Sequence, residues 1–147
     1  MSKNYLYEFR TRRVRRSFAH EGCKFTEPEH VAEFLLELTR ELDREHFYAL
    51  YLDVQGALIG FEVVAVGGMA GVEVHPREVF RGAILAGAFA IIVAHNHPSG
   101  DPTPSAEDYV LTKRLKEAGD IVGIPVYDHI VVAPGAGMHS MAQQGGF

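Results

Sequence analysis

The sequence predicts a single domain of the α/β class, of the α+β type, on three observations. Segments with the apolar spacing of helices alternate along the chain with short apolar runs that are typical of strands. The 147 residues, 47% of them hydrophobic and 22% charged, suffice for one buried core. The chain lacks the glycine-rich phosphate loop of nucleotide-binding α/β folds, so that class of fold is not indicated.

Composition narrows the classes of function and the expected compartment. A net charge of −5 argues against a protein that coats nucleic acid with a generally basic surface. Nothing approaches the ~20 consecutive apolar residues of a membrane span, and the N-terminus lacks the apolar core of a signal peptide. The single cysteine, Cys23, forms neither an internal disulfide nor a cysteine-rich zinc site. We therefore expect a cytoplasmic protein without a membrane partner.

Residues 1–24 differ from the rest and are expected to form a basic N-terminal arm ahead of a domain at 25–147. A short strand is expected over Tyr5–Phe9. Five arginines follow within seven residues: Arg10, Arg12, Arg13, Arg15 and Arg16. They suit salt-dependent contact with phosphates, but an exposed arm or edge strand protected from aggregation by its charge is an alternative. Pairing with the acidic remainder of the chain is another.

The first half of the domain is expected to contain one helix and two strands. Thr26 suits the N-cap of a helix that has Pro28 in its first turn and Glu29 as the acidic partner of the cap. Its core-facing positions follow at helical spacing: Val31, Phe34, Leu35, Leu38 and Leu42. Strands are expected over 47–53 and 57–66, joined by a turn at 54–56. Gly67-Gly68 ends the second strand.

The second half is expected to continue the alternation. A helix begins after His75, a cap or turn residue, with Pro76 in its first turn. Its buried side is expected to contain Val79, Phe80, Ile84 and Leu85. Another helix is expected over 109–118, then strand segments 124–127 and 130–132 interrupted by Asp128-His129. That pair either orients a site residue by a hydrogen bond or is an ordinary strand-end pair. A loop at 134–137 and a short tail from residue 140 end the chain.

The apolar run 91–94 leads directly into the most informative stretch of the sequence. Residues two apart on a strand face the same way, so His95 and His97 project together from the strand's end. A Pro/Gly turn follows, Ser105 opens a helix, and Asp108 in the first turn faces back toward the strand. Two imidazoles and one carboxylate with a position left open describe a catalytic zinc site. A packed histidine and a helix cap made by Ser105 and its acidic partner are the alternatives.

This stretch resembles a known family signature. His95-x-His97-Pro98-x-Gly100 followed by Ser105-x-x-Asp108 resembles the motif of JAMM (MPN+) metalloproteases, and the fuller His-Asn-His-Pro-Ser-Gly-Asp-Pro-x-Pro-Ser-x-x-Asp is similar to the bacterial RadC group. Similarity extends from about residue 25 to residue 147. It implies the MPN/JAB, cytidine-deaminase-like architecture, a curved mixed β-sheet flanked by helices. RadC proteins of full length carry a helical N-terminal region related to helix-hairpin-helix modules; the 24 residues here are too few for it.

The resemblance also implies a site and an activity. His95, His97 and Asp108 would hold one Zn²⁺ per chain, although iron or cobalt also suits such ligands. Glu45 occupies the place of the JAMM glutamate, a general base and then acid, with Glu41 as its nearest rival. Ser105 would stabilise the oxyanion. A protein or peptide substrate, cleaved at a peptide or isopeptide bond, is expected.

A DNA-associated function is the alternative. RadC proteins have historically been linked to DNA repair, and zinc would then be structural while the 10–16 arm contacts nucleic acid. Salt-dependent DNA binding that survives loss of Glu45 but fails without the arginines would identify this function. The zinc-deaminase pattern of His-x-Glu with Cys-x-x-Cys is absent from the sequence.

Overall fold

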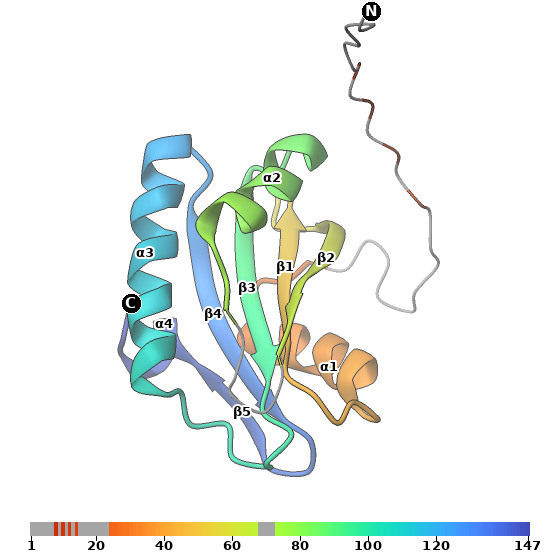
Figure 1. Ribbon diagram of the computed structural model, residues 1–147, viewed down its shortest axis with the longest axis vertical. Coiled ribbons are helices and arrows are strands. Elements are labelled where there is room, and N and C mark those ends of the chain that lie inside the picture. The colour runs from red at the N-terminus through yellow and green to blue at the C-terminus, as the bar shows by residue number, and fades with distance from the viewer. Residues whose placement is uncertain (1–7, 9, 11, 13, 15–23, 68–72) are drawn as a thin grey trace, which may run out of the picture.

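A mixed five-stranded sheet with helices packed on both faces forms the protein, as the computed structural model shows (Figure 1). The structure describes residues 8, 10, 12, 14, 24–67 and 73–147. The helices are α1 (Pro28–Thr39), α2 (Pro76–Ala86), α3 (Ala106–Val122) and α4 (Met141–Gln144). The strands are β1 (His46–Leu52), β2 (Leu58–Val66), β3 (Ala90–Asn96), β4 (Val126–Ala133) and β5 (Gly137–Ser140). The predicted mixed sheet flanked by helices is confirmed.

The strand order β2-β1-β3-β4-β5 explains where a site can form. β1 runs antiparallel to both β2 and β3, whereas β3 and β4 are parallel. A parallel pair requires a crossover, and α3 provides it. The crossover brings the first turn of α3 to the carboxyl end of β3. The start of β1 lies at the same end of the sheet, because Phe47 pairs with His95.

Two apolar layers hold the sheet. One joins α2 and α3 to the sheet through Val79, Phe80 and Leu115, which pack with Val93 of β3. The other packs α1 beneath the opposite face, where Phe34 lies between the rings of Phe25 and Phe61. β3 is buried along its whole length between the two layers. A strand fixed on both faces is a rigid support for side chains at its end.

Three details of the predicted helices are wrong. The N-cap of α1 is Glu27 instead of Thr26, without a side-chain cap hydrogen bond among the described residues, and the helix ends at Thr39, before Leu42. In α2, Ile84 and Leu85 are 56% and 50% exposed. The buried row of this helix is Val79, Phe80 and Ala83. With 3.6 residues per turn, Ile84 and Leu85 lie roughly 90° and 170° from the centre of that row.

The C-terminal half is more regular than predicted. α3 extends on both sides of 109–118 and passes through Gly119, where a Cβ atom would lie 2.6 Å from the carbonyl oxygen of Ile124. The helix approaches the following segment too closely for a larger residue. β4 continues through Asp128-His129, although its pairing with β3 skips Tyr127, and both side chains have buried hydrogen-bond partners. The tail from residue 140 also forms structure: β5 ends there and α4 follows.

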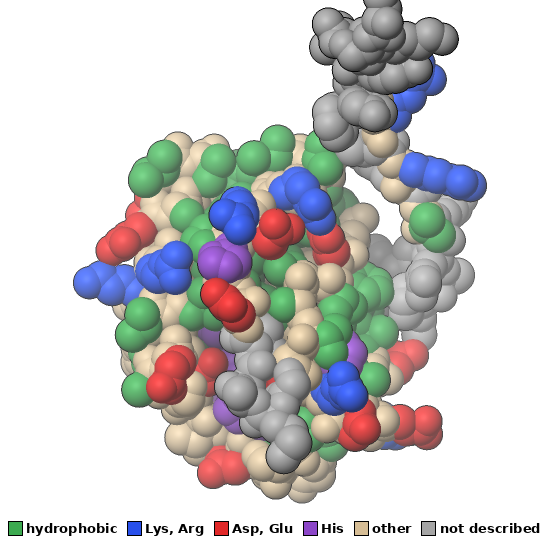
Figure 2. All heavy atoms as spheres, viewed as in Figure 1, with side chains coloured by type: hydrophobic (Ala, Val, Ile, Leu, Met, Phe, Trp, Pro, Cys, Tyr) green, Lys and Arg blue, Asp and Glu red, His purple; other side chains and the backbone are tan. Residues whose placement is uncertain are grey.

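The N-terminal arm contributes little to the described structure. Apart from Glu8, the expected strand at Tyr5–Phe9 lies outside the described residues, as do Arg13, Arg15, Arg16 and Cys23. Arg10 and Arg12 are exposed, and Arg10 forms an ion pair of 3.0 Å with Glu8. On the face seen in Figure 2, the described acidic and basic side chains are interspersed. Within the described ranges, no helix is long and apolar enough to cross a membrane.

Candidate metal centre

Three side chains from the β3 end and the start of α3 converge on one point. His95 Nε2 lies 3.0 Å from His97 Nε2, and the Asp108 Oδ2 atom lies 3.3 Å from the first and 3.7 Å from the second. Ligand atoms bound to a tetrahedral zinc ion lie about 3.3 Å from one another. The three separations bracket this value, so the donor set has the chemistry and the spacing of three zinc ligands.

The turn between the histidines and α3 gives the site its shape. The amide of His97 donates to Val132 of β4 at 2.8 Å, which continues the sheet one residue beyond β3. Gly100 then turns the chain with a φ of +90°, a conformation that residues other than glycine rarely adopt. Its amide donates to the His97 carbonyl. His97 Nδ1 lies 2.8 Å from the carbonyl oxygen of Asp101. With Nδ1–H donating there, the neutral ring has its lone pair on Nε2, whereas the protonated ring donates from Nε2 to Asp108.

Ser105 and Asp108 form a complete capping box at the start of α3. The amide of Asp108 donates to Ser105 Oγ at 3.2 Å, and the amide of Ser105 donates to Asp108 Oδ2 at 2.8 Å. The capping alternative from the sequence therefore holds, but it does not exclude the site. The same Oδ2 atom that accepts the cap hydrogen bond is the one nearest both imidazoles. One carboxylate fixes the helix start and faces the histidines.

The charges of the cluster stabilise one another. Burial by itself would raise the pKa of Asp108, but the interactions with His95 and His97 and the Ser105 amide together lower that pKa far below its usual range. The interaction with Asp108 raises the pKa of His97, against the effect of burial. Asp108 is therefore ionised at neutral pH. A metal that replaces the protons between these groups would compensate the same negative charge.

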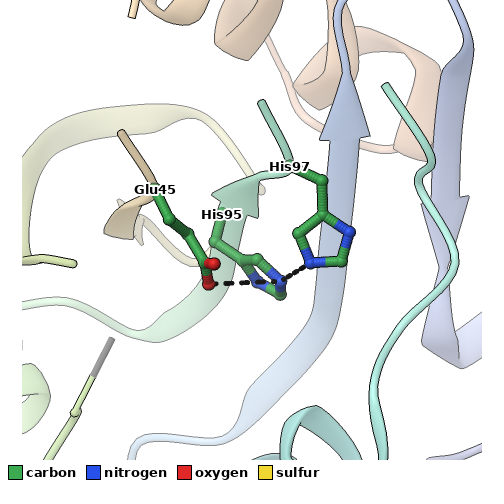
Figure 3. A group of neighbouring side chains, drawn as sticks. All are labelled: Glu45, His95 and His97. Atoms are coloured by element: carbon green, nitrogen blue, oxygen red, sulfur yellow. Dashed lines mark hydrogen bonds and ion pairs between the residues drawn. The ribbon is translucent and has the colours of Figure 1, made fainter. Parts of the chain in front are cut away.

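Glu45 lies beside the histidines, from the start of β1 (Figure 3). Continuing the Phe47–His95 register by two residues places Glu45 opposite His97, on the face to which both histidines project. Its Oε1 atom is 3.9 Å from His95 Nε2. Donor atoms of Glu45, His95 and His97 all lie within 4.8 Å of one another, so this cluster could hold a metal ion. The rival Glu41 is exposed and lies in the turn after α1.

A buried chain of hydrogen bonds leads from His95 into the core. His95 is fully buried, and its Nδ1 lies 2.8 Å from Nε2 of His129 in β4. His129 Nδ1 in turn lies 2.6 Å from the Thr112 hydroxyl of α3. Burial lowers the pKa of His129 well below its usual value, with a further lowering from His95, so His129 is neutral. A neutral ring donates at one nitrogen and accepts at the other, which makes the chain directional.

Only one of the two possible proton arrangements suits metal binding. The Thr112 hydroxyl can donate to the carbonyl oxygen of Asp108, 2.6 Å away. His129 Nδ1–H then donates to Thr112, and His95 Nδ1–H donates to His129. This arrangement leaves the lone pair of His95 Nε2 facing His97 and Asp108. Hydrogen bonds of this kind fix the tautomer of a ligating histidine and raise its basicity.

Of the pair Asp128-His129, only His129 has the orienting contacts. Asp128 accepts hydrogen bonds from the His129 amide, the Ala142 amide and Ser140, on the side of the sheet where Ile92 and Ile130 lie. His75 is the N-cap of α2 and pairs with Glu73 at 3.3 Å. The sequence patterns did not predict the contacts of the Thr112 and Asn96 side chains near the site. Thr112 is a buried polar residue one helical turn beyond Asp108, and that position was the available signal.

Comparison with known proteins places the chain in a family. Residues 25–146 match the model of the RadC-like JAB domain. The chain is 46% identical over 134 residues to a UPF0758 protein of Caldanaerobacter subterraneus, covering 91% of this chain and 57% of the relative. It is 52% identical over 105 residues to a UPF0758 protein of Desulforamulus reducens, covering 71% and 46%. The chain thus spans about half the length of the curated relatives that it matches, and their names state no activity.

Proposed function

Because the chain belongs to the RadC-like JAB domain family, we propose that it is a zinc-dependent hydrolase of the JAMM type that cleaves peptide or isopeptide bonds. One observation carries the proposal: His95, His97 and Asp108 converge with zinc-like spacing while Glu45 stands beside them. A structural zinc site normally has four protein ligands, whereas a catalytic one has three and an open position. Three ligands with a separate carboxylate alongside favour catalysis.

The residues divide the chemical work as follows. A zinc ion held by the three ligands would lower the pKa of a coordinated water from about 16 to about 7. Glu45 would accept the proton of the attacking water at its carboxylate and deliver it to the leaving amine. Its position opposite His97 suits this transfer, because the carboxylate is within 3.9 Å of a ligand atom yet outside the group of three.

Ser105 is proposed to donate a hydrogen bond to the carbonyl oxygen of the substrate as it gains charge. Its Oγ accepts the amide of Asp108, which occupies a lone pair and leaves the hydroxyl proton for donation. The capping and catalytic roles are therefore compatible. Loss of one such donor costs about 3–4 kcal/mol of transition-state stabilisation in other hydrolases. Ser105→Ala should reduce turnover and leave the zinc content unchanged.

Metal content is the first test of the proposal. Protein purified without added metal should contain about one zinc per chain by inductively coupled plasma mass spectrometry, and His97→Ala should contain little. The same measurement would detect iron or cobalt in place of zinc. A parent protein that contains no metal and takes up none from added zinc would contradict a zinc hydrolase.

Hydrolysis is the second test. The zinc-loaded parent would be incubated with an unfolded protein such as casein and with an isopeptide-linked peptide. Cleavage should disappear in Glu45→Gln, a variant that keeps the shape of the side chain but cannot accept a proton. Equal cleavage by the parent and by Glu45→Gln would exclude Glu45 as the base.

A further inference from the structure

Asn96 stands between the two histidines of the motif and faces away from them. It is the last residue of β3, and its neighbours on the same face, Ala94 and Ile92, belong to the layer that packs on α1. The side chain is fully buried. A buried amide is costly unless its donor and acceptor are both satisfied, so the partners of Asn96 are informative.

Both partners of the Asn96 side chain belong to the segment that carries Glu45. The amide of His46 donates to Asn96 Oδ1 at 2.7 Å, and Asn96 Nδ2 donates to the carbonyl oxygen of Arg44 at 3.0 Å. These two main-chain groups flank Glu45 on either side. The Asn96 side chain thus pairs with them as the backbone of a neighbouring strand would, one residue beyond the last backbone pair, Phe47 with His95.

The opposite edge of the same segment is held as well. The Gly67 amide, just after β2, donates to the carbonyl oxygen of Glu45 at 2.8 Å. Successive carbonyl groups of an extended segment point to alternate sides. Gly67 therefore holds Glu45 from the β2 side while Asn96 holds its two neighbours from the β3 side. With the backbone fixed from both sides, the Glu45 side chain can project only above or below the sheet.

We propose that Asn96 is a positioning residue that fixes the Glu45 carboxylate next to the metal ligands. This inference rests on the proposed function, since it assigns Asn96 a role toward the general base. The geometry explains why an asparagine is required. Aspartate lacks the donor for Arg44, serine is too short to reach both groups, and an aliphatic residue would leave both buried partners unsatisfied. The strand that supplies two ligands also sets the place of the base.

A double-mutant cycle on zinc affinity tests the proposal without a substrate. Zinc dissociation constants would be measured by chelator competition for the parent, Glu45→Gln, Asn96→Ala and the double variant. Removing the Glu45 charge beside the metal should weaken zinc binding about tenfold, as the loss of other neighbours of metal ligands does. In the Asn96→Ala background, the Glu45 carboxylate is displaced from the metal and contributes less to zinc binding. Glu45→Gln should then change the zinc affinity less than twofold.

Ile92→Ala is the matched control, because Ile92 is buried on the same strand and face but pairs with Leu50, further along β1 than the 44–46 segment. It should lower stability and preserve the tenfold effect of Glu45→Gln. Asn96→Asp, which keeps only the acceptor for His46, serves as a second variant if Asn96→Ala folds poorly. Amide hydrogen exchange of the parent provides a measurement that needs no variant: the His46 amide should be protected like an amide inside β1.

Each outcome decides between the two proposals. An equal effect of Glu45→Gln in both Asn96 backgrounds, with zinc still bound, would overturn the role of Asn96 and leave the hydrolase intact. Rapid exchange of the His46 amide in the parent would do the same. A parent protein that binds no zinc, or whose zinc affinity is indifferent to Glu45, would instead overturn the assignment of the site, and the role of Asn96 with it.

Discussion

Two carboxylates of this protein make similar hydrogen bonds at the start of a helix, but their other partners differ and their pKa values are shifted in opposite directions. Asp108 and Asp128 each lie next to a serine that is the N-cap of a helix, Ser105 for α3 and Ser140 for α4. Each carboxylate also accepts a backbone amide at a helix start, from Ser105 in one case and from Ala142 in the other. In their local contacts, both carboxylates bind the start of a helix, although Asp128 itself belongs to β4.

Their remaining partners separate them. The oxygens of Asp128 receive Ser140 Oγ at 2.5 Å and the amides of His129 and Ala142 at 2.7 and 2.9 Å. Burial nevertheless raises its pKa. Asp108 faces two imidazole nitrogens, and its pKa is lowered. A carboxylate whose oxygens are occupied by amides and a hydroxyl connects structural elements, whereas one that faces titratable imidazoles has contacts that a metal could replace.

Asp108→Asn should have the largest effect, and it should weaken metal binding far more than it lowers stability. An amide oxygen lacks the negative charge of the ligand, so we expect zinc affinity to fall more than about a hundredfold, beyond the loss caused by outer hydrogen-bond partners. The free energy of unfolding without metal should fall by about 1–2 kcal/mol at pH 7, since asparagine keeps part of the cap but loses the charge that interacts with the imidazoles. Chelator competition and urea unfolding in excess chelator measure the two quantities. Zinc binding within about tenfold of the parent's would contradict the ligand role.

Asp128→Ala should give the opposite result. It leaves the Ser140 hydroxyl and the amides of His129 and Ala142 without their acceptor, and we expect a loss of about 2–4 kcal/mol in the free energy of unfolding. Zinc affinity of the folded variant should stay within about threefold of the parent, because the histidine cluster keeps its own contacts. If zinc binding fell as far as in Asp108→Asn, the two carboxylates would not be separable in this way.

Thr112→Val should have an intermediate effect, and it tests whether the hydrogen bonds behind His95 contribute to metal binding. The variant removes the acceptor of His129 Nδ1–H and so disfavours the arrangement that leaves a lone pair on His95 Nε2. Zinc affinity should fall about tenfold. Leu115→Val, which removes a single methylene group one turn further along the buried side of α3, is the control and should leave zinc affinity unchanged. An equal loss in both variants would point to a general loosening of α3.

What the sequence could predict depends on whether the contact is local. The pairing of Ser105 with Asp108 and the common face of His95 and His97 follow from helix and strand geometry, whereas the mixed sheet with its flanking helices was expected from the family resemblance. The contacts of Asn96 with residues 44–46 and of His129 with Thr112 join segments 17 to 52 residues apart, which no local pattern specifies. The prediction that Ile84 and Leu85 are buried was wrong for a related reason. The spacing of apolar residues in α2 is compatible with two hydrophobic faces, and tertiary packing buries only one of them.

The smallest expected effect concerns Asp128 and its charge. Asp128→Asn can keep both amide contacts at Oδ1 and donate from Nδ2 to Ser140, so its stability at pH 7 should lie within about 1 kcal/mol of the parent or exceed it. A raised pKa means that the folded state binds the proton more tightly. Its stabilising effect is complete below the unfolded value near 3.8 and is lost as pH rises through the folded pKa. The advantage of the asparagine variant, measured by urea unfolding, should therefore shrink as pH is lowered from 7 toward 4. An advantage that grew on acidification would mean that the three donors outweigh burial, and that Asp128 resembles Asp108 in its electrostatics after all.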